Sequence, residues 1–161
     1  MLKQLVTAAS LTAAALSSSL VFALDDARSS IHITANIPTL QFHVQPRDPN
    51  FGKDEVMSYN TVSGTLTSLR QTFDVKNTNG SVHAYIEGGP ASLYNGSDAI
   101  ALTTKFNGVT LTATPLEVVD DATSTPGTQA DMTIVAAKPL DTQNGLYTAD
   151  MTVIFDAVPR P

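Results

Sequence analysis

The sequence has no cysteine among its 161 residues. Disulfide bonds, thiolate metal sites and thiol nucleophiles are therefore excluded, and stability has to come from packing or from another chain. Basic residues are also few, with nine Lys and Arg against fifteen Asp and Glu and a formal net charge of −6. Nucleic acids and anionic membranes are bound through patches of Lys and Arg. The composition argues against both partners, and the negative charge is explained by solubility.

Long hydrophobic runs are missing beyond the first segment. Residues 1–23 carry Lys3, then an apolar run over 5–16, then Val21-Phe22-Ala23, which has small residues at the positions read by a signal peptidase. The run is too short to span a bilayer and is followed by the acids Asp25-Asp26. The sequence therefore predicts a signal peptide that is cleaved after Ala23 and an exported mature protein of a single domain.

Helical spacing is missing as well, because no segment of ten or more residues combines it with capping residues. Apolar and polar residues alternate instead, and turn signals such as Asn79-Gly80 and Asn107-Gly108 separate the alternating segments. This pattern predicts an all-β antiparallel sandwich. The expected strands are 31–37, 39–45, 56–60, 66–76, 81–87, 99–106, 109–114, 116–119, 132–137 and 146–157. Residues 91–97 and 120–130 are expected to be loops, and Pro159-Arg160-Pro161 is expected to be unable to extend a sheet.

The first predicted strand, residues 31–37, directly follows the export signal. Its apolar side chains fall on one face, and Pro38 ends it because proline has no N–H to continue a ladder. The apolar face consists of Ile31, Ile33, Ala35 and Ile37. Such a strand near a free terminus pairs within its own domain or adds to the sheet of a neighbour.

Candidates for catalysis or metal binding are weak. His32, His43 and His83 are not at metal-ligand spacing, and each alternates with apolar residues, so we expect all three to face solvent. The carboxylates of Asp25-Asp26 and Asp120-Asp121 are expected to be solvated loop acids. A calcium site made by Asp120, Asp121 and a loop carbonyl is the lesser alternative. The sequence predicts no metal site, no cofactor and no catalytic residue.

Sugar chemistry offers two further signals. Asn79-Gly80-Ser81 and Asn95-Gly96-Ser97 match the glycosylation sequon, although a turn explains the first. Tyr85, Tyr94 and Tyr147 are candidates for a sugar-binding platform, but core packing is the favoured role of Tyr147. By elimination, the chain is predicted to be a binding or structural protein and not an enzyme.

Four segments carry a resemblance to a known family. They are the strand 31–37, the segment 69–79 (LRQTFDVKNTN), the segment 132–139 (MTIVAAKP) and the terminal segment 145–155 (GLYTADMTVIF). In this order they resemble major pilins of the alternate chaperone–usher class, the colonisation-factor-antigen type of fimbria, or α-fimbriae. The resemblance spans nearly the whole mature chain.

The resemblance implies an incomplete immunoglobulin-like antiparallel β-sandwich over residues 39–161. Residues 24–38 are then an N-terminal extension that completes the sandwich of a neighbouring subunit, with Ile31, Ile33, Ala35 and Ile37 as the donor face. The acceptor groove is expected to include Leu40, Phe42, Val44, Tyr147, Met151, Val153 and Phe155. The implied partners are further copies of the chain in a head-to-tail fibre, a periplasmic chaperone, an outer-membrane usher and a tip adhesin.

The sequence analysis thus favours the structural major subunit of a surface fimbria that supports adhesion. The alternative is a secreted monomeric β-sandwich, either an adhesin or a carbohydrate-binding module. A periplasmic hydrolase has the least support, because no catalytic constellation is present. Fibres in the shed surface fraction would favour the first interpretation, and monomers would favour the second.

Overall fold

The computed structural model describes residues 32, 34, 35, 41–96 and 98–161. The chain divides into two units, Met1–Ala35 and Asn36–Pro161. In the first unit His32, Thr34 and Ala35 are exposed and have no regular secondary structure, and a hydrogen bond of 3.1 Å joins Thr34 Oγ1 to His32 Nε2. The second unit is the β-sandwich described below.

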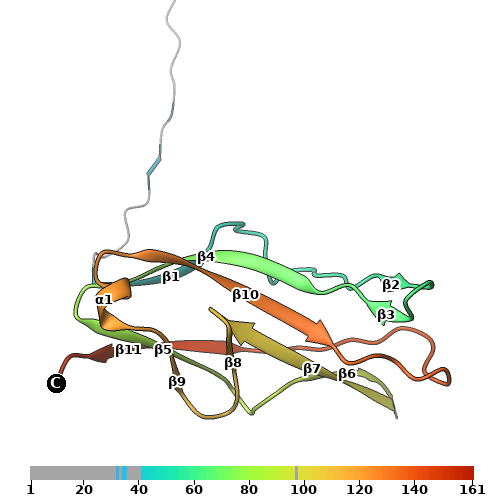
Figure 1. Cartoon of the computed structure of the whole chain (residues 1–161). Coiled ribbons are helices and arrows are strands. Elements are labelled where there is room, and N and C mark those ends of the chain that lie inside the picture. Colours follow the sequence, from blue (N-terminus) through green and yellow to red (C-terminus); the bar gives the residue numbers. More distant parts are fainter. Residues whose placement is uncertain (1–31, 33, 36–40, 97) are drawn as a thin grey trace, which may run out of the picture. The chain divides into compact units, whose positions relative to one another are not determined.

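Two main antiparallel sheets form the sandwich (Figure 1). The larger sheet has the order β1 (Phe42–Pro46), β4 (Leu69–Asn77), β10 (Thr128–Ala136), β7 (Asp98–Phe106) and β6 (Ser92–Asn95), with β8 (Val109–Thr110) paired to β7. The smaller sheet has the order β11 (Val153–Pro159), β5 (Gly80–Ile86) and β9 (Leu116–Val119). A separate hairpin joins β2 (Tyr59–Asn60) and β3 (Thr65–Leu66), and one short helix, α1 (Asp121–Ser124), lies between β9 and β10.

Alternation places one face of each central strand in the core. In β5 every second residue from Gly80 to Ile86 is buried, and β7 alternates in the same way up to Phe106. The turn after β7 is a tight hairpin, in which Asn107 and Gly108 both have positive φ, 49° and 80°. The Asn107 side chain also donates a 2.7 Å hydrogen bond to the carbonyl of Val118, which ties this hairpin to β9.

The core lies between the two sheets. Its buried apolar residues are Phe73, Val75, Val82, Ala84, Ile86, Leu102, Phe106, Leu111, Val118, Val119, Ala130, Met132 and Ile134. At its centre the ring of Phe106 meets that of Phe73 edge to face, with centroids 5.4 Å apart. Such pairs contribute about 0.5–1.5 kcal/mol beyond their burial.

Most predicted strands are present, but several local predictions are wrong. Residues 91–97 were expected to be a loop, yet 92–95 form β6 and pair with β7. The expected loop 120–130 contains α1 and the first three residues of β10. The expected strand 109–114 is reduced to the two residues of β8, and 56–60 is reduced to β2.

A further error concerns the predicted strand 146–157, which begins only at Val153. Upstream, Thr148 exchanges two backbone hydrogen bonds with Tyr94 of β6, so the segment crosses between the sheets before it joins β5. At the other end Pro159 belongs to β11 and lies opposite Gly80, so this proline does extend the sheet. Proline is compatible with this position because β11 is an edge strand. No helix among the described residues is long and apolar enough to cross a bilayer.

Gly80 generates a prediction about stability. A Cβ atom there would lie 1.9 Å from the carbonyl oxygen of Val158 and 2.9 Å from the backbone nitrogen of Arg160. Backbone atoms of a paired strand cannot rotate away, so we expect Gly80→Ala to lower the free energy of unfolding by about 3 kcal/mol or more. Urea denaturation followed by circular dichroism measures this.

The matched control is Gly88→Ala. Gly88 has φ +77° and no atom within 4 Å of its added Cβ. This variant therefore isolates backbone strain, which costs about 1–2 kcal/mol. Equal losses in the two variants would show that the close approach of β11 to Gly80 is not the cause.

Candidate functional site

One side of the sandwich is closed by the chain itself. β9 lies beside β5 in the smaller sheet, and β10 lies beside β4 in the larger one. Only α1 and a few flanking residues separate β9 from β10, so both strands lie on the same side of the β4–β5 pair. The side chain of Ser124 in α1 donates a 2.5 Å hydrogen bond to the carbonyl of Gly80 and fixes this crossing.

The opposite side of the sandwich is open. β1 is the other neighbour of β4, and β11 is the other neighbour of β5. Within the described ranges, β1 pairs only with β4, and β11 pairs only with β5. Each strand therefore keeps one free edge on this side. An edge strand presents unpaired N–H and C=O groups and is a template for another chain.

Apolar side chains lie between these two edge strands. β1 contributes Phe42 and Val44, and β11 contributes Val153 and Phe155, all half-buried and packed against the core. The ring centroid of Phe155 lies 4.9 Å from that of Phe106, which is fully buried. Because these side chains stay half-buried among the described residues, the open side brings solvent close to the centre of the core.

The predicted groove residues are distributed as follows. Five are half-buried and pack against the core: Phe42, Val44, Met151, Val153 and Phe155. Leu40 lies outside the described residues. Tyr147 is half-buried too, and its hydroxyl is buried with no hydrogen-bond partner among the described residues. Met151 is held by the Thr104 hydroxyl, which donates to its sulfur at 3.3 Å.

The predicted donor face is mostly beyond the described part of the chain. Ile31, Ile33 and Ile37 lie outside the described residues, and Ala35 is exposed. The role of this face stays a prediction.

Phe51 and Met57 are half-buried, pack against the core and were not identified from the sequence. Phe51 lies in a segment expected to be a loop, and its ring meets Phe73 at 6.0 Å. It could have been found only as an isolated aromatic residue among turn residues, because no alternation surrounds it.

The C-terminal end of β11 is anchored by polar contacts. Asp121 forms an ion pair with Arg160 and accepts a 2.8 Å hydrogen bond from the Thr125 hydroxyl. The backbone N–H of Arg160 donates to the carbonyl of Asn79 at 2.9 Å. The Arg160 guanidinium, followed by the Thr125 hydroxyl, lowers the pKa of Asp121 below its usual 3.8.

Asp120, in contrast, caps α1. Its Oδ1 accepts a 2.7 Å hydrogen bond from the backbone N–H of Thr123, and the side chain and backbone of Thr123 together lower the pKa of Asp120. Asp120 and Asp121 thus have protein partners, which leaves the calcium alternative without support. In the part of the chain that the structure describes, no three His, Asp or Glu side chains gather as they would around a metal.

The histidines and tyrosines are not brought together. His83 lies on β5 with Nε2 3.9 Å from Glu117 of β9, whereas His43 lies on β1 in the other sheet. Tyr85 is half-buried, and Tyr94 is 58 % exposed. The three tyrosines named above therefore do not share one exposed face, and the sugar-binding alternative gains no support.

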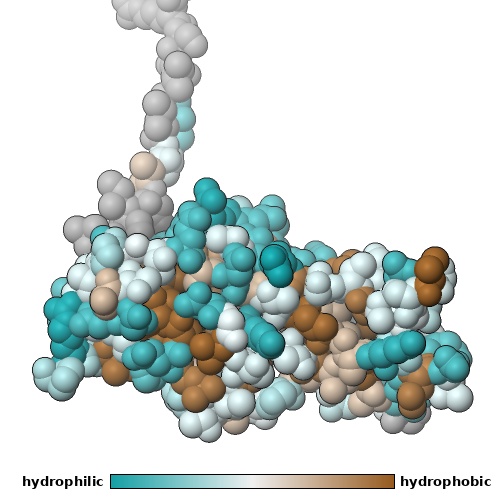
Figure 2. Space-filling model, viewed as in Figure 1, coloured by the Kyte–Doolittle hydropathy of each residue, from teal (hydrophilic) through white to brown (hydrophobic). Residues whose placement is uncertain are grey.

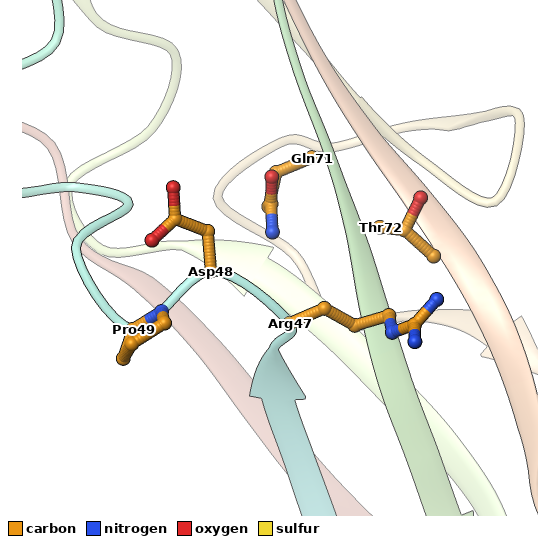
Figure 3. Close-up of a pocket in the computed structure, with 5 residues that line it drawn as sticks. All are labelled: Arg47, Asp48, Pro49, Gln71 and Thr72. Carbon is orange, nitrogen blue, oxygen red and sulfur yellow. The ribbon is translucent and has the colours of Figure 1, made fainter.

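A shallow depression next to β1 is polar (Figure 3). Arg47 extends across β4 towards Thr72, while the Asp48 carboxylate points away from it. Arg47 Nε lies 4.0 Å from a carboxylate oxygen of Asp74, and its backbone N–H donates to the Thr72 carbonyl at 3.0 Å. These contacts continue the pairing of β1 with β4 and include no acid–base pair suited to catalysis.

The comparisons with known proteins fit this architecture. The family model described as CS1 type fimbrial major subunit matches residues 27–156. The chain belongs to this family. It is a pilin, the structural major subunit of a fimbria of the colonisation-factor-antigen type, and not an enzyme. Membership implies a surface fimbria built by polymerisation of the pilin with copies of itself.

A solved structure shares the fold of this pilin. The CooA pilin subunit from enterotoxigenic Escherichia coli matches with a TM-score of 0.58 and 14% sequence identity, over 75% of this chain and 90% of that chain. At this identity the likeness concerns the fold alone. The expected all-β antiparallel sandwich is confirmed. A comparison with curated proteins gave no match.

The Asp121–Arg160 pair predicts a pH dependence. Because the folded-state pKa of Asp121 is lowered, its contribution to stability is present above about pH 3.8 and is lost as the pH falls through the folded-state pKa. Asp121→Asn should therefore melt below the wild type at pH 7, and the difference should shrink below pH 4. Thermal melts from pH 7 to pH 3 measure it.

Asp98→Asn is the control, because it removes the same charge from an exposed site beside the β6–β7 turn. A difference between Asp121→Asn and the wild type that stays constant over the whole pH range would contradict this assignment.

Proposed function

We propose that the open side between β1 and β11 is the acceptor groove for a donor strand, and that residues 31–37 of a neighbouring pilin are that strand. The observation that carries this proposal is the pair of free edges, one on each sheet, that flank half-buried apolar side chains. An extended segment with one apolar face supplies what this groove lacks, namely backbone hydrogen bonds for the edges and side chains for the core.

The energetics favour occupation of the groove. Each of Ile31, Ile33 and Ile37 contributes roughly 1.5–3 kcal/mol if its side chain is fully buried in the neighbour. Their partners would be the side chains that remain half-buried in the single chain, such as Val44, Val153 and Phe155. Backbone pairing with the free edges adds register and direction.

Such a contact joins two different surfaces, the arm of one pilin and the groove of the next. A heterologous contact of this kind does not close on itself and builds an open filament. The same chain thus acts as donor to one neighbour and acceptor to the other. This geometry agrees with a major subunit present in many copies.

The proposal includes an export route. A signal peptide of residues 1–23 is removed, leaving an arm of residues 24–38 and a sandwich of residues 39–161. Before assembly, the open groove is an aggregation hazard, because it combines a free strand edge with exposed core. A periplasmic chaperone that fills the groove, an outer-membrane usher that exchanges the chaperone for the next arm, and a tip adhesin complete the pathway to the cell surface.

The donor face is tested by Ile33→Asp. This substitution removes one buried apolar side chain and places an unpaired charge in the groove, at a combined cost of several kcal/mol, on the order of 5. The sandwich of the donor does not contain residue 33, so the subunit should still fold and be exported. We expect surface fibres, counted by electron microscopy with chaperone and usher coexpressed, to be absent.

Thr34→Asp is the matched control, because Thr34 alternates with Ile33 and lies on the polar face of the predicted strand. We expect this variant to assemble normally. Equal assembly, or equal failure, of the two variants would mean that the arm is not recognised by an alternating face, and the donor-strand mechanism would be wrong for this pilin.

A further inference from the structure

Large exposed hydrophobic side chains are concentrated at one end of the sandwich. The end of the sandwich that carries β2 and β3 lies opposite the end that carries α1 (Figure 1), and it shows hydrophobic groups among polar ones (Figure 2). We define the apolar end surface as Tyr59, Val62, Tyr94, Leu140 and Leu146, which are 56%, 96%, 58%, 66% and 82% exposed. Exposed apolar groups that gather in this way mark interaction sites more often than isolated ones do.

The segment between β10 and β11 is held in place at this end. Asn95 donates a 2.9 Å hydrogen bond to the Asn144 carbonyl, and Gln143 donates to the Ala99 carbonyl at 3.1 Å. On the other side, the Lys138 side chain lies against Gly64 of the β2–β3 hairpin. Polar contacts therefore fix a loop that exposes Leu140 and Leu146 to water, and burial of these side chains against another surface would be favourable.

The course of β11 indicates which surface of a neighbour reaches this end. β11 runs from Val153, opposite Ile86, to Pro159, opposite Gly80 at the α1 end. β1 runs the opposite way, from Phe42 at the α1 end to Pro46, so a strand between the two edges is antiparallel to one of them and parallel to the other. The inference takes β11 as the antiparallel partner, because it is the longer edge, with seven residues against five in β1. A donor strand antiparallel to β11 would start at the α1 end of the acceptor and leave the groove at the apolar end.

The length of the arm then limits where the donor subunit can lie. The donor enters its own sandwich at Phe42, which lies opposite Asn77 at its α1 end. Only residues 38–41 connect strand 31–37 to Phe42, and four residues span at most about 14 Å. The α1 end of the donor is thus held within reach of the apolar end of the acceptor.

We propose that the apolar end surface of each pilin packs against the α1 end of the next pilin in the fibre. The α1 end is suited to this contact, because its exposed residues include small or apolar ones, Ala122, Pro126, Pro159 and Pro161, and its Asp121 is neutralised by Arg160. The inference rests on the proposed function, since it takes the arm as the link between subunits. It adds a second interface, which limits bending between neighbours.

The absence of native cysteine allows a direct test by cross-linking. Leu146→Cys and Ala122→Cys are combined in one chain, fibres are assembled, treated with a short bismaleimide, and fully denatured. We expect a ladder of covalent oligomers. The control combines Ala122→Cys with Val135→Cys, since Val135 is an exposed hydrophobic residue on β10 and lies outside the apolar end surface. This control is expected to stay monomeric.

Several outcomes would overturn the proposal. One is an equal ladder in the control; another is covalent dimers from Ala122→Cys alone, which would place two α1 ends together. A third is maleimide labelling of Leu146→Cys in fibres that equals its labelling in the free subunit, as expected for a surface facing solvent or host tissue. Should Leu146→Cys prevent assembly, Leu140→Cys replaces it with the same expectations.

The two proposals fail in different ways. Fibres that form normally but give no ladder contradict the end contact and leave the donor strand intact. Fibres that are indifferent to Ile33→Asp contradict the donor strand itself, whatever the cross-linking shows.

Discussion

The structure depends on the outer edges of β1 and β11, which pair with no other strand among the described residues. Each of the two sheets ends on the same side in an edge strand, while the opposite side is bridged through α1. Phe155 shows the consequence, because it is half-buried although its ring contacts the fully buried Phe106. A domain that leaves core side chains and strand edges open gains stability when another segment covers them. In the account proposed above, this deficit drives the assembly of the fimbria.

Contacts at the C-terminal end of β11 keep this edge strand in a defined position. Gly80 allows the backbone of Val158 to approach closely, and Arg160 joins the end of the strand to Asp121. The Ser124 hydrogen bond to the Gly80 carbonyl secures the turn from the other sheet. A strand edge held in this way offers an incoming strand a preformed register, so less conformational entropy is lost on binding.

Alternation predicted the strands in which every second residue is buried along the whole length, such as β5, where Val82, Ala84 and Ile86 are all buried. It did not predict where strands change sheets. Residues 146–152 alternate, but the pairing of Thr148 with Tyr94 depends on a distant strand and breaks the expected continuity. The helix α1 was missed because four residues are too few for periodicity. Phe51 reaches the core from a loop, through tertiary packing that the local sequence does not encode.

The central claim, that a neighbouring chain covers the edges of β1 and β11 in the fibre, is tested most directly by amide hydrogen exchange. Peptides covering 42–46 and 153–159 are compared between the purified monomer and the assembled fibre, with β9 as the internal reference. The account predicts much slower exchange in the fibre for β1 and β11 and little change for β9, which already pairs with β5 on the closed side. Unchanged exchange of β1 and β11 on assembly would contradict it.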